Sequence, residues 1–331
     1  MKKKYFLLLP IILSLISCGS IYEPEGTSEE WIAIIDIDGS NLEYICKSEG
    51  AIPYFVPDFE NPSEEIVLLD SQIKIDLMNQ DGSNRRTIID SVGTVFNFSH
   101  DKTKMLLNRE GEIYIANVDG TEFQNLTNTP DTCESDPSFS PDDQLVIYCY
   151  TNIIDSARVI AYRHLETNQV IKIIEEVYSE WMNFKSPIFV NTSSIYFGQN
   201  DPDTLNSDGL YYASSDGTSK TLIENGYIHS RISFSSSGNK VAYRNSYLLK
   251  IYDITNDELI DLAEHAWSSK PIFNNDGSLL SIGPLIYFTD TYENYNILHN
   301  YSLEEVCYTY HSIDFNSSSS KVIMNVDRKY P

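Results

Sequence analysis

Residues 112–150 read EIYIANVDGTEFQNLTNTPDTCESDPSFSPDDQLVIYCY, and this stretch decides the fold. An apolar run, 113–118, is followed by Asp119-Gly120, a pair that tolerates the positive φ of a tight hairpin turn. After a polar loop, Pro137-Ser138-Phe139-Ser140-Pro141-Asp142 leads into a second apolar run, 145–150. The pattern predicts four short antiparallel strands joined by hairpin turns.

The same unit recurs along the whole chain. Each copy places a Phe near the end of one strand, just before a polar turn, and these seven Phe residues stand at positions 55, 98, 139, 189, 234, 273 and 315. The mean step is about 43 residues, a period typical of propeller blades with four strands. The sequence therefore predicts an all-β protein, a single seven-bladed β-propeller of four-stranded antiparallel blades.

The order of the hairpins predicts how the ring closes. The first hairpin, near 31–46, is of the outer type with an Asp-Gly turn, whereas the last, near 312–326, is of the inner type with the repeat Phe. Each alone would leave an unpaired strand edge, which favours aggregation. We therefore expect both ends to share one composite blade, with 31–331 forming the propeller domain.

The amino terminus predicts export and anchoring. Three lysines precede the apolar run 5–16, which is shorter than the ~20 residues of a membrane-spanning helix. The run ends in Leu15-Ile16-Ser17-Cys18, which resembles the lipobox of bacterial lipoproteins. The resemblance implies a signal peptide over 1–17, acylation of Cys18 with chains such as palmitate, and a flexible tether over 18–30. The alternative is an ordinary secretory signal with an incidental cysteine.

Localisation follows from the same resemblance. Gly19 occupies the position where Asp would retain a lipoprotein in the inner membrane. We therefore expect a lipid-anchored protein of the cell envelope, in the outer membrane if the host has one. The membrane would be contacted through the lipid anchor only.

The copy at 112–150 also resembles the TolB-type, WD40-like propeller repeat. The matching residues are Ile113-Tyr114, Asp119-Gly120-Thr121, Leu126-Thr127 and Pro137 to Asp142, while Asp143 stands where the family has Gly. The resemblance extends over most of 31–326. It implies a propeller but not TolB itself, because no α/β segment precedes the first repeat.

Composition limits the partners. The chain has 331 residues, 23 basic and 48 acidic, for a formal net charge of −25. Such a surface repels phosphate backbones, so we expect no nucleic-acid partner.

Among the cysteines, folding the hairpin about Asp142-Asp143 places Cys149 opposite Ser135, which leaves a Cys133–Cys149 disulfide open as an alternative. We expect no disulfide between Cys46 and Cys307, because equivalent positions in different blades lie too far apart.

Candidate binding residues lie on the face with the long connections between hairpins. Long loops on a rigid scaffold are the usual functional surface. The predicted partner-binding residues are aromatic or charged: Tyr178, Trp181, Phe184, Trp267, Arg231, Lys270, Asp136 and His311. They suit an envelope protein, a peptide or a glycan. The alternatives are that the rings pack between blades and that the two cations pair with Asp136 and its neighbours.

Catalytic motifs are absent from the sequence. The six histidines are scattered, with no metal-ligand spacing, and no nucleophile elbow is present. We therefore expect no enzyme activity, no metal and no cofactor, and a non-catalytic binding platform as the function. The alternatives are a polysaccharide-acting lyase or hydrolase with a site at the channel mouth, and a structural envelope scaffold. The oligomeric state and the identity of the partner are not predicted.

Overall fold

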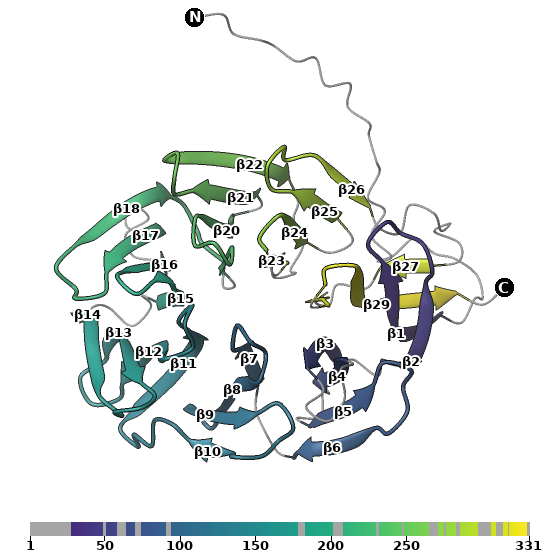
Figure 1. Ribbon diagram of the computed structural model, residues 1–331. Coiled ribbons are helices and arrows are strands. Elements are labelled where there is room, and N and C mark those ends of the chain that lie inside the picture. The colour runs from purple at the N-terminus through teal and green to yellow at the C-terminus, as the bar shows by residue number, and fades with distance from the viewer. Residues whose placement is uncertain are drawn as a thin grey trace, which may run out of the picture.

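The computed structural model describes most of the propeller domain. The described residues are 28–48, 51–57, 64–69, 74–90, 94–177, 183–200, 208–229, 232–246, 248–264, 271–274, 276–282, 285–296, 306–308, 314–316 and 318–329. They form seven antiparallel sheets arranged as blades around a central channel (Figure 1). The predicted seven-bladed all-β propeller is confirmed.

Six blades follow one another along the chain, each running from the channel outward. Blade 1 consists of β3 (Ile52–Pro57), β4 (Glu64–Leu69), β5 (Ile75–Asn79) and β6 (Arg86–Ile89). Blade 2 consists of β7 (Thr94–Phe98), β8 (Lys104–Arg109), β9 (Glu112–Asn117) and β10 (Gln124–Asn125). Blade 3 consists of β11 (Thr132–Phe139), β12 (Leu145–Asn152), β13 (Ala157–His164) and β14 (Val170–Val177). Blade 4 consists of β15 (Asn183–Asn191), β16 (Ser194–Asn200), β17 (Gly209–Ser214) and β18 (Lys220–Asn225). Blade 5 consists of β19 (Ser233–Phe234), β20 (Lys240–Asn245), β21 (Leu248–Asp253) and β22 (Glu258–Glu264). Blade 6 consists of β23 (Ile272–Phe273), β24 (Leu279–Ile282), β25 (Leu285–Phe288) and β26 (Asn294–Asn296).

Blade 7 closes the ring with strands from both ends of the described chain. Its outer strands are β1 (Ser28–Asp36) and β2 (Glu43–Lys47), and its inner strands are β27 (Val306–Tyr308), β28 (Asp314–Phe315) and β29 (Lys321–Lys329). β1 pairs with β29 antiparallel along its whole length, from Ser28 opposite Lys329 to Asp36 opposite Lys321. The predicted composite blade is therefore confirmed (Figure 1). β27 lies in what the sequence indicates as a long connection between hairpins, yet it forms a strand that pairs with β29.

The hydrophobic core lies between blades. Seven clusters of buried apolar side chains each join two neighbouring blades. Along β29, Met324 belongs to the cluster shared with blade 6, whereas Ile323 belongs to the cluster shared with blade 1. Both faces of a blade are thus buried, which is why the strands read as continuous apolar runs without strict alternation.

The Asp-Gly-Ser/Thr turns fix the outer hairpins. In blade 2 the backbone N–H of Gly120 donates to Asn117 O at 2.9 Å, and Asp119 Oδ1 accepts from the Thr121 N–H at 2.9 Å and from its hydroxyl at 2.6 Å. Gly120 has φ +86°, and a Cβ there would lie 2.7 Å from Ile88 O of blade 1. Glycine is therefore required for both the turn and the contact with the preceding blade.

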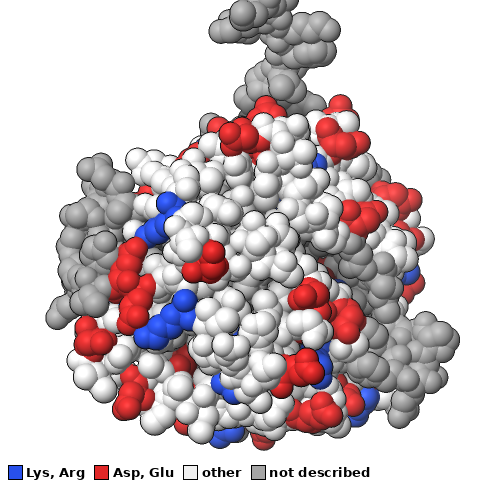
Figure 2. Space-filling model, turned by 60° about the vertical axis from the view of Figure 1, so that its left-hand side comes forward, with Lys and Arg blue, Asp and Glu red and all other residues white. Residues whose placement is uncertain are grey.

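The cysteines and the surface complete the description. The predicted register is confirmed, because Ser135 lies opposite Cys149, and Cys133 and Cys149 are both free, so the disulfide left open is not formed. Figure 2 shows Asp and Glu side chains spread over one face, with Lys and Arg beside them. Among the described residues, no helix is long and apolar enough to cross a membrane.

Candidate active site in the central channel

The inner strands and the turns that follow them enclose a cavity of about 430 Å³ in the channel. Its lining comes from every blade, and includes Tyr54, Asn97, Phe98, Ser99, His100, Lys102, Ser138, Phe139, Ile188, Ile232, Ser233, Phe234, Ser236, Asn274, Asp314 and Phe315. Five of the seven repeat Phe residues line the cavity, namely Phe98, Phe139, Phe234, Phe273 and Phe315. The residues that define the repeat therefore also form the walls of the cavity.

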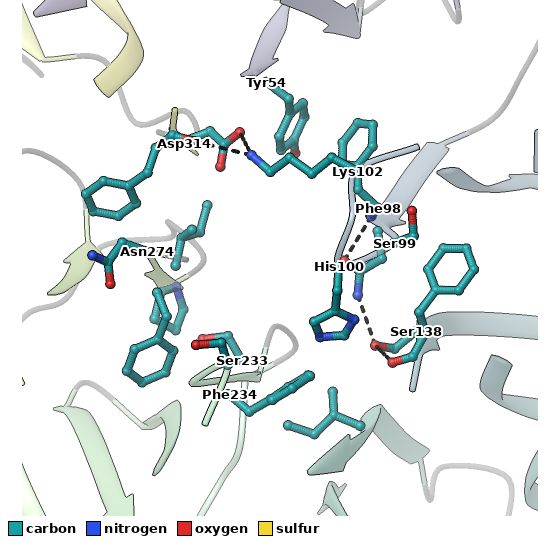
Figure 3. A pocket seen from close by; sticks show the side chains of 18 of the residues that line it. Tyr54, Phe98, Ser99, His100, Lys102, Ser138, Ser233, Phe234, Asn274 and Asp314 are labelled. Carbon is teal, nitrogen blue, oxygen red and sulfur yellow. Dashed lines mark hydrogen bonds and ion pairs between the residues drawn. The ribbon is translucent and has the colours of Figure 1, made fainter. Parts of the chain in front are cut away.

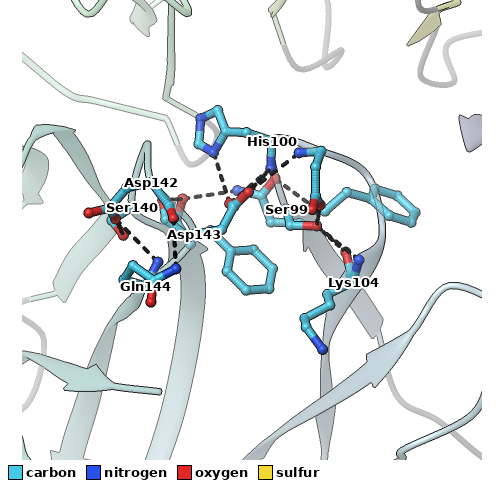
Figure 4. Close-up of polar contacts among 12 residues, drawn as sticks. Ser99, His100, Lys104, Ser140, Asp142, Asp143 and Gln144 are labelled. Atoms are coloured by element: carbon cyan, nitrogen blue, oxygen red, sulfur yellow. Dashed lines mark hydrogen bonds and ion pairs between the residues drawn. The ribbon is translucent and has the colours of Figure 1, made fainter. Parts of the chain in front are cut away.

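His100 is held in a fixed orientation at this cavity. It lies in the turn between β7 and β8, and its Nδ1 is 3.1 Å from Asp143 Oδ1 in the corresponding turn of blade 3 (Figure 4). The backbone N–H of His100 also donates to both oxygens of that carboxylate, at 2.9 and 3.0 Å. Its ring reaches into the channel and lies 5.4 Å from the ring of Phe234 (Figure 3). With Nδ1 engaged, Nε2 is the ring nitrogen left to exchange a proton with a ligand.

Lys102, from the same turn, brings a positive charge to the cavity. Its Nζ lies 2.7 Å from Asp314 Oδ2 of blade 7 and 3.3 Å from the carbonyl oxygen of Phe315 (Figure 3). The same Asp314 oxygen accepts the backbone N–H of Phe55 of blade 1 at 3.0 Å. Asp314 is 6% exposed, so this pair joins three blades at the inner ring in a largely buried setting.

Both turns depart from the repeat at positions with special backbone geometry. The repeat favours Ser-Pro-Asp-Gly, and this last position has positive φ in blades 5 and 6, where it is Gly238 and Gly277. In blade 2 the same position is Lys102, with φ 56°, and in blade 3 it is Asp143, with φ 55°. A non-glycine residue there costs about 1–2 kcal/mol. Ser319 of blade 7 has the same geometry at this position, with φ 56°, so blades 2 and 3 are distinguished by the charged side chains that they place there.

Carboxylates near His100 remain ionised well into the acid range. The hydroxyl of Ser140 donates to Asp142 and lowers the pKa of that carboxyl, and positive charge on His100 lowers it further. Burial acts to raise the pKa of Asp101, but hydrogen bonds from Ser99 and Thr103 bring it below its usual value. The turns that flank His100 therefore carry negative charge that can stabilise an imidazolium.

The remaining lining suits a sugar chain. Aromatic rings from opposite sides, among them Phe98 and Phe234, supply apolar faces, and Ser99, Ser138 and Asn274 supply hydroxyl and amide groups (Figure 3). A pocket with apolar walls and a few polar groups is typical of small-molecule sites. The cavity can therefore hold a polar ligand that also has flat apolar faces, with a base and a cation beside it.

Of the residues predicted from sequence, six lie outside the described residues: Tyr178, Trp181, Arg231, Trp267, Lys270 and His311. Phe184 is described and is 5% exposed, packed edge-on against Phe197 at 5.6 Å between ring centres. It belongs to the core between blades 3 and 4, which is the alternative that sequence analysis left open. Asp136 lies in a bulge of β11, with φ 50°, and does not line the cavity.

The cavity is lined by residues of short turns, although binding residues were expected on the face with the long connections. His100, Lys102 and Ser236 all lie in the short turns after inner strands, and all three line the cavity. These turns are short, but seven of them converge on the channel, so single side chains are enough to build a site. The signal that could have identified it was available in the sequence, since His100 and Lys102 replace Pro and Gly of the repeat.

The described residues, including those that line the cavity, offer no set of ligands for a metal ion. Within the described ranges, no group of three or more His, Cys, Asp or Glu side chains is placed to hold a metal ion. In the cavity lining only His100 and Asp314 are of these types, and each is engaged as described above. The described residues therefore do not fit a resident metal, and no chemical step below uses one.

Comparison with known proteins gives similarity at the level of the fold. No protein-family model and no curated protein matches the sequence. An oligogalacturonate lyase from Vibrio parahaemolyticus is similar in structure, with a TM-score of 0.64 and 11% identity over 92% of this chain and 98% of that chain. An oligogalacturonate lyase in complex with manganese gives the same TM-score and identity, over 92% of this chain and 96% of that one. TolB from Acinetobacter baumannii gives a TM-score of 0.51 and 18% identity, over 76% and 64% of the two chains. TolB-like propellers are thus among the structural neighbours.

These findings correct the expected function. We expected a non-catalytic binding platform and no enzyme, whereas the similar structures include oligogalacturonate lyases, which are enzymes. That expectation is contradicted by these neighbours, and the alternative of an enzyme that acts on polysaccharide becomes a proposal. Because identity is low, the likeness itself shows the fold, and the chemistry has to come from the cavity residues.

Proposed function

We propose that the protein is a lyase that cleaves an acidic, uronate-containing oligosaccharide in the central channel. The observation that carries the proposal is the convergence of His100, oriented by Asp143, and Lys102 on one cavity.

The reaction is a β-elimination in which the two side chains have separate roles. His100 Nε2 removes the proton from the carbon next to the uronate carboxylate, and the C–H electron pair becomes a carbon–carbon double bond. The glycosidic C–O bond on the adjacent carbon breaks, and its oxygen takes a proton from solvent water to leave as an alcohol. Lys102 stabilises the negative charge that develops on the carboxylate, and Asp143 stabilises the imidazolium.

The lining favours elimination over hydrolysis. Glycoside hydrolases generally use two carboxyl groups on either side of the scissile bond. Among the described lining residues Asp314 is the single carboxylate, and it is bound to Lys102 and to the backbone of Phe55. One base and one cation meet the needs of an elimination at a uronate, whereas a pair of acids for hydrolysis is not assembled by these residues.

The experiment measures the ultraviolet absorbance of the unsaturated uronate product formed from oligogalacturonate. We expect His100→Gln to lower kcat/KM by roughly 10²- to 10⁴-fold, which is the usual contribution of a general base. Asp143→Asn should lower kcat with a smaller effect on KM, because Asp143 orients the base and does not contact substrate.

His164→Gln is the matched control, since His164 lies in β13 of blade 3 and does not line the cavity. Equal activity of the His100 and His164 variants would contradict the proposal. Absence of product from oligogalacturonate and from other uronate oligomers with the wild-type protein would also contradict it.

The proposal places this enzyme at the cell envelope through acylation of Cys18. The support is the lipobox-like Leu15-Ile16-Ser17-Cys18 after an apolar run that is short for a membrane span. A glycan of the envelope or its surroundings is the expected partner. Cys18→Ser should abolish incorporation of labelled palmitate and release the protein from membranes, and unchanged labelling would contradict the anchor.

A further inference from the structure

A second cluster of cationic and aromatic side chains lies at the junction of blades 4 and 5, outside the cavity lining. Lys185 of β15 donates from Nζ to the hydroxyl of Tyr227 at 3.2 Å, and the same nitrogen lies 5.0 Å from the centre of the Tyr227 ring. The ring of His229 meets that of Tyr227 edge-on at 5.0 Å. The backbone N–H of His229 donates to the carbonyl oxygen of Arg244 in β20 at 3.0 Å. We refer to Lys185, Tyr227, His229 and Arg244 as the basic cluster.

The backbone that carries Tyr227 and His229 is rigidly held. Between them, Ile228 is fully buried, and the side chain of Asn200 both accepts from its N–H at 3.0 Å and donates to its carbonyl oxygen at 2.7 Å. The N–H of Gly226 donates to Asp208 O at 3.0 Å. Tyr227 nevertheless keeps 43% of its surface exposed, so a fixed aromatic face is presented to solvent.

Electrostatics set this cluster apart in a chain of net charge −25. Burial lowers the pKa of His229, and the positive charges of Arg244 and then Lys185 lower it further. Lys185 has no carboxylate within salt-bridge distance among the described residues, whereas Lys102, Lys220 and Lys250 each have one. Positive charge is therefore concentrated at a point where the described residues supply no neutralising acid to Lys185.

The position of the cluster relates it to the channel. Lys185 precedes the cavity-lining Ile188 by three residues, and His229 precedes the cavity-lining Ile232 by three residues. Lys185 and Ile188 both belong to β15, and at about 3.3 Å per strand residue their separation is at most roughly 10 Å. The basic cluster thus lies at the end of blades 4 and 5 opposite to the end that carries the turns after the inner strands.

We infer that the basic cluster is a binding subsite for the carboxylate of an acidic sugar, with Tyr227 supporting the sugar ring. A carboxylate would bind to Lys185, with Arg244 adding positive potential, while the lowered pKa of His229 keeps its imidazole neutral. This inference rests on the proposed function, because it extends the substrate from the cavity to the second mouth of the channel. It adds a specificity element for chains that carry a negative charge on a sugar some distance from the bond that is cleaved.

The test measures binding of a galacturonate trimer by calorimetry to the full chain carrying His100→Gln, so that turnover does not interfere. We expect Lys185→Met in this background to weaken binding about tenfold, which corresponds to about 1.4 kcal/mol. Tyr227→Leu should also weaken it, whereas Lys172→Met should not, because Lys172 is exposed on blade 3 and pairs with Glu175. Thermal melting of each variant confirms that it is folded.

Two further ligands show whether the loss of affinity in Lys185→Met reflects recognition of a sugar carboxylate, of a neutral sugar or of any anion. A neutral glucose trimer should bind weakly and should be insensitive to Lys185→Met. Sulfate should bind far more weakly than the galacturonate trimer. Unchanged affinity in Lys185→Met, or sulfate binding as tight as that of the trimer, would overturn the inference. If the wild-type protein forms no unsaturated product but trimer binding still depends on Lys185, the proposed reaction fails and the subsite stands.

Discussion

Closure of the ring by blade 7 makes a prediction about the carboxyl-terminal strands. Removing residues 314–331 deletes β28 and β29, and β29 is the partner of β1 along its nine residues. The deletion also removes five buried apolar side chains, namely Phe315, Val322, Ile323, Met324 and Val326. At ~1.5–3 kcal/mol each, their burial contributes on the order of 8–15 kcal/mol. That is as large as the whole stability of a typical domain, ~5–15 kcal/mol.

We therefore expect the shortened chain to have no cooperative unfolding transition. The assay is urea denaturation followed by circular dichroism, with a chain lacking only residues 330 and 331 as the control. Adding a peptide of residues 312–331 should restore the transition, because it supplies the missing strands of blade 7. A shortened chain that keeps the full transition without the peptide would refute the reasoning that ring closure holds the propeller together.

Three further predictions test the turns, the inner ring and a buried carboxyl. Gly120→Ala should destabilise the fold by roughly 1–3 kcal/mol in denaturation experiments, because φ at this position is +86° and the new Cβ would contact Ile88 O. The control is Glu122→Ala at an exposed position, which should leave the stability unchanged. Asp314→Ala should cost about 3–5 kcal/mol because it leaves Lys102 without its carboxylate in a largely buried place. Lys102→Met should also destabilise the fold, because it leaves the more buried Asp314 without its cation, and no loss in either variant would contradict the argument. Burial raises the pKa of Glu134 above 4.5, so this carboxyl group ionises at a lower pH in the unfolded chain than in the folded one, and the free energy of unfolding should fall as pH increases from about 4.5. Glu134→Gln should remove that part of the pH dependence. Identical pH profiles of the wild type and the variant would show that Glu134 does not contribute.

The sequence predicted the architecture because every blade repeats the same physical solution. The seven Phe positions, the Asp-Gly turns and the unpaired terminal hairpins each constrain the same ring, and the register that placed Cys149 opposite Ser135 follows from one turn. Phe184 was misjudged as a loop residue because β15 begins at Asn183, earlier than the pattern of the repeat indicates. Because β15 starts earlier than the repeat indicates, Phe184 lies within the strand and its ring packs in the core instead of at the surface.

The site was harder to predict because it comes from residues far apart in sequence. His100 and Lys102 lie two residues apart, but their partners Asp143 and Asp314 are 43 and 212 residues away, in other blades. Sequence analysis favoured long loops, whereas the cavity is built by short turns that converge on the channel. In a repeat protein, the departures from the repeated turn carry the information, and Asp143 in place of Gly was the visible one.

The most direct test of the central claim is a crystal structure of the His100→Gln variant soaked with a galacturonate oligomer. We predict a sugar ring in the channel cavity between Phe98 and Phe234, with a carboxylate near Lys102 and the chain directed toward Lys185. An oligomer bound on the outer surface of the blades, or a channel filled by water at ligand concentrations that saturate binding in solution, would contradict the account.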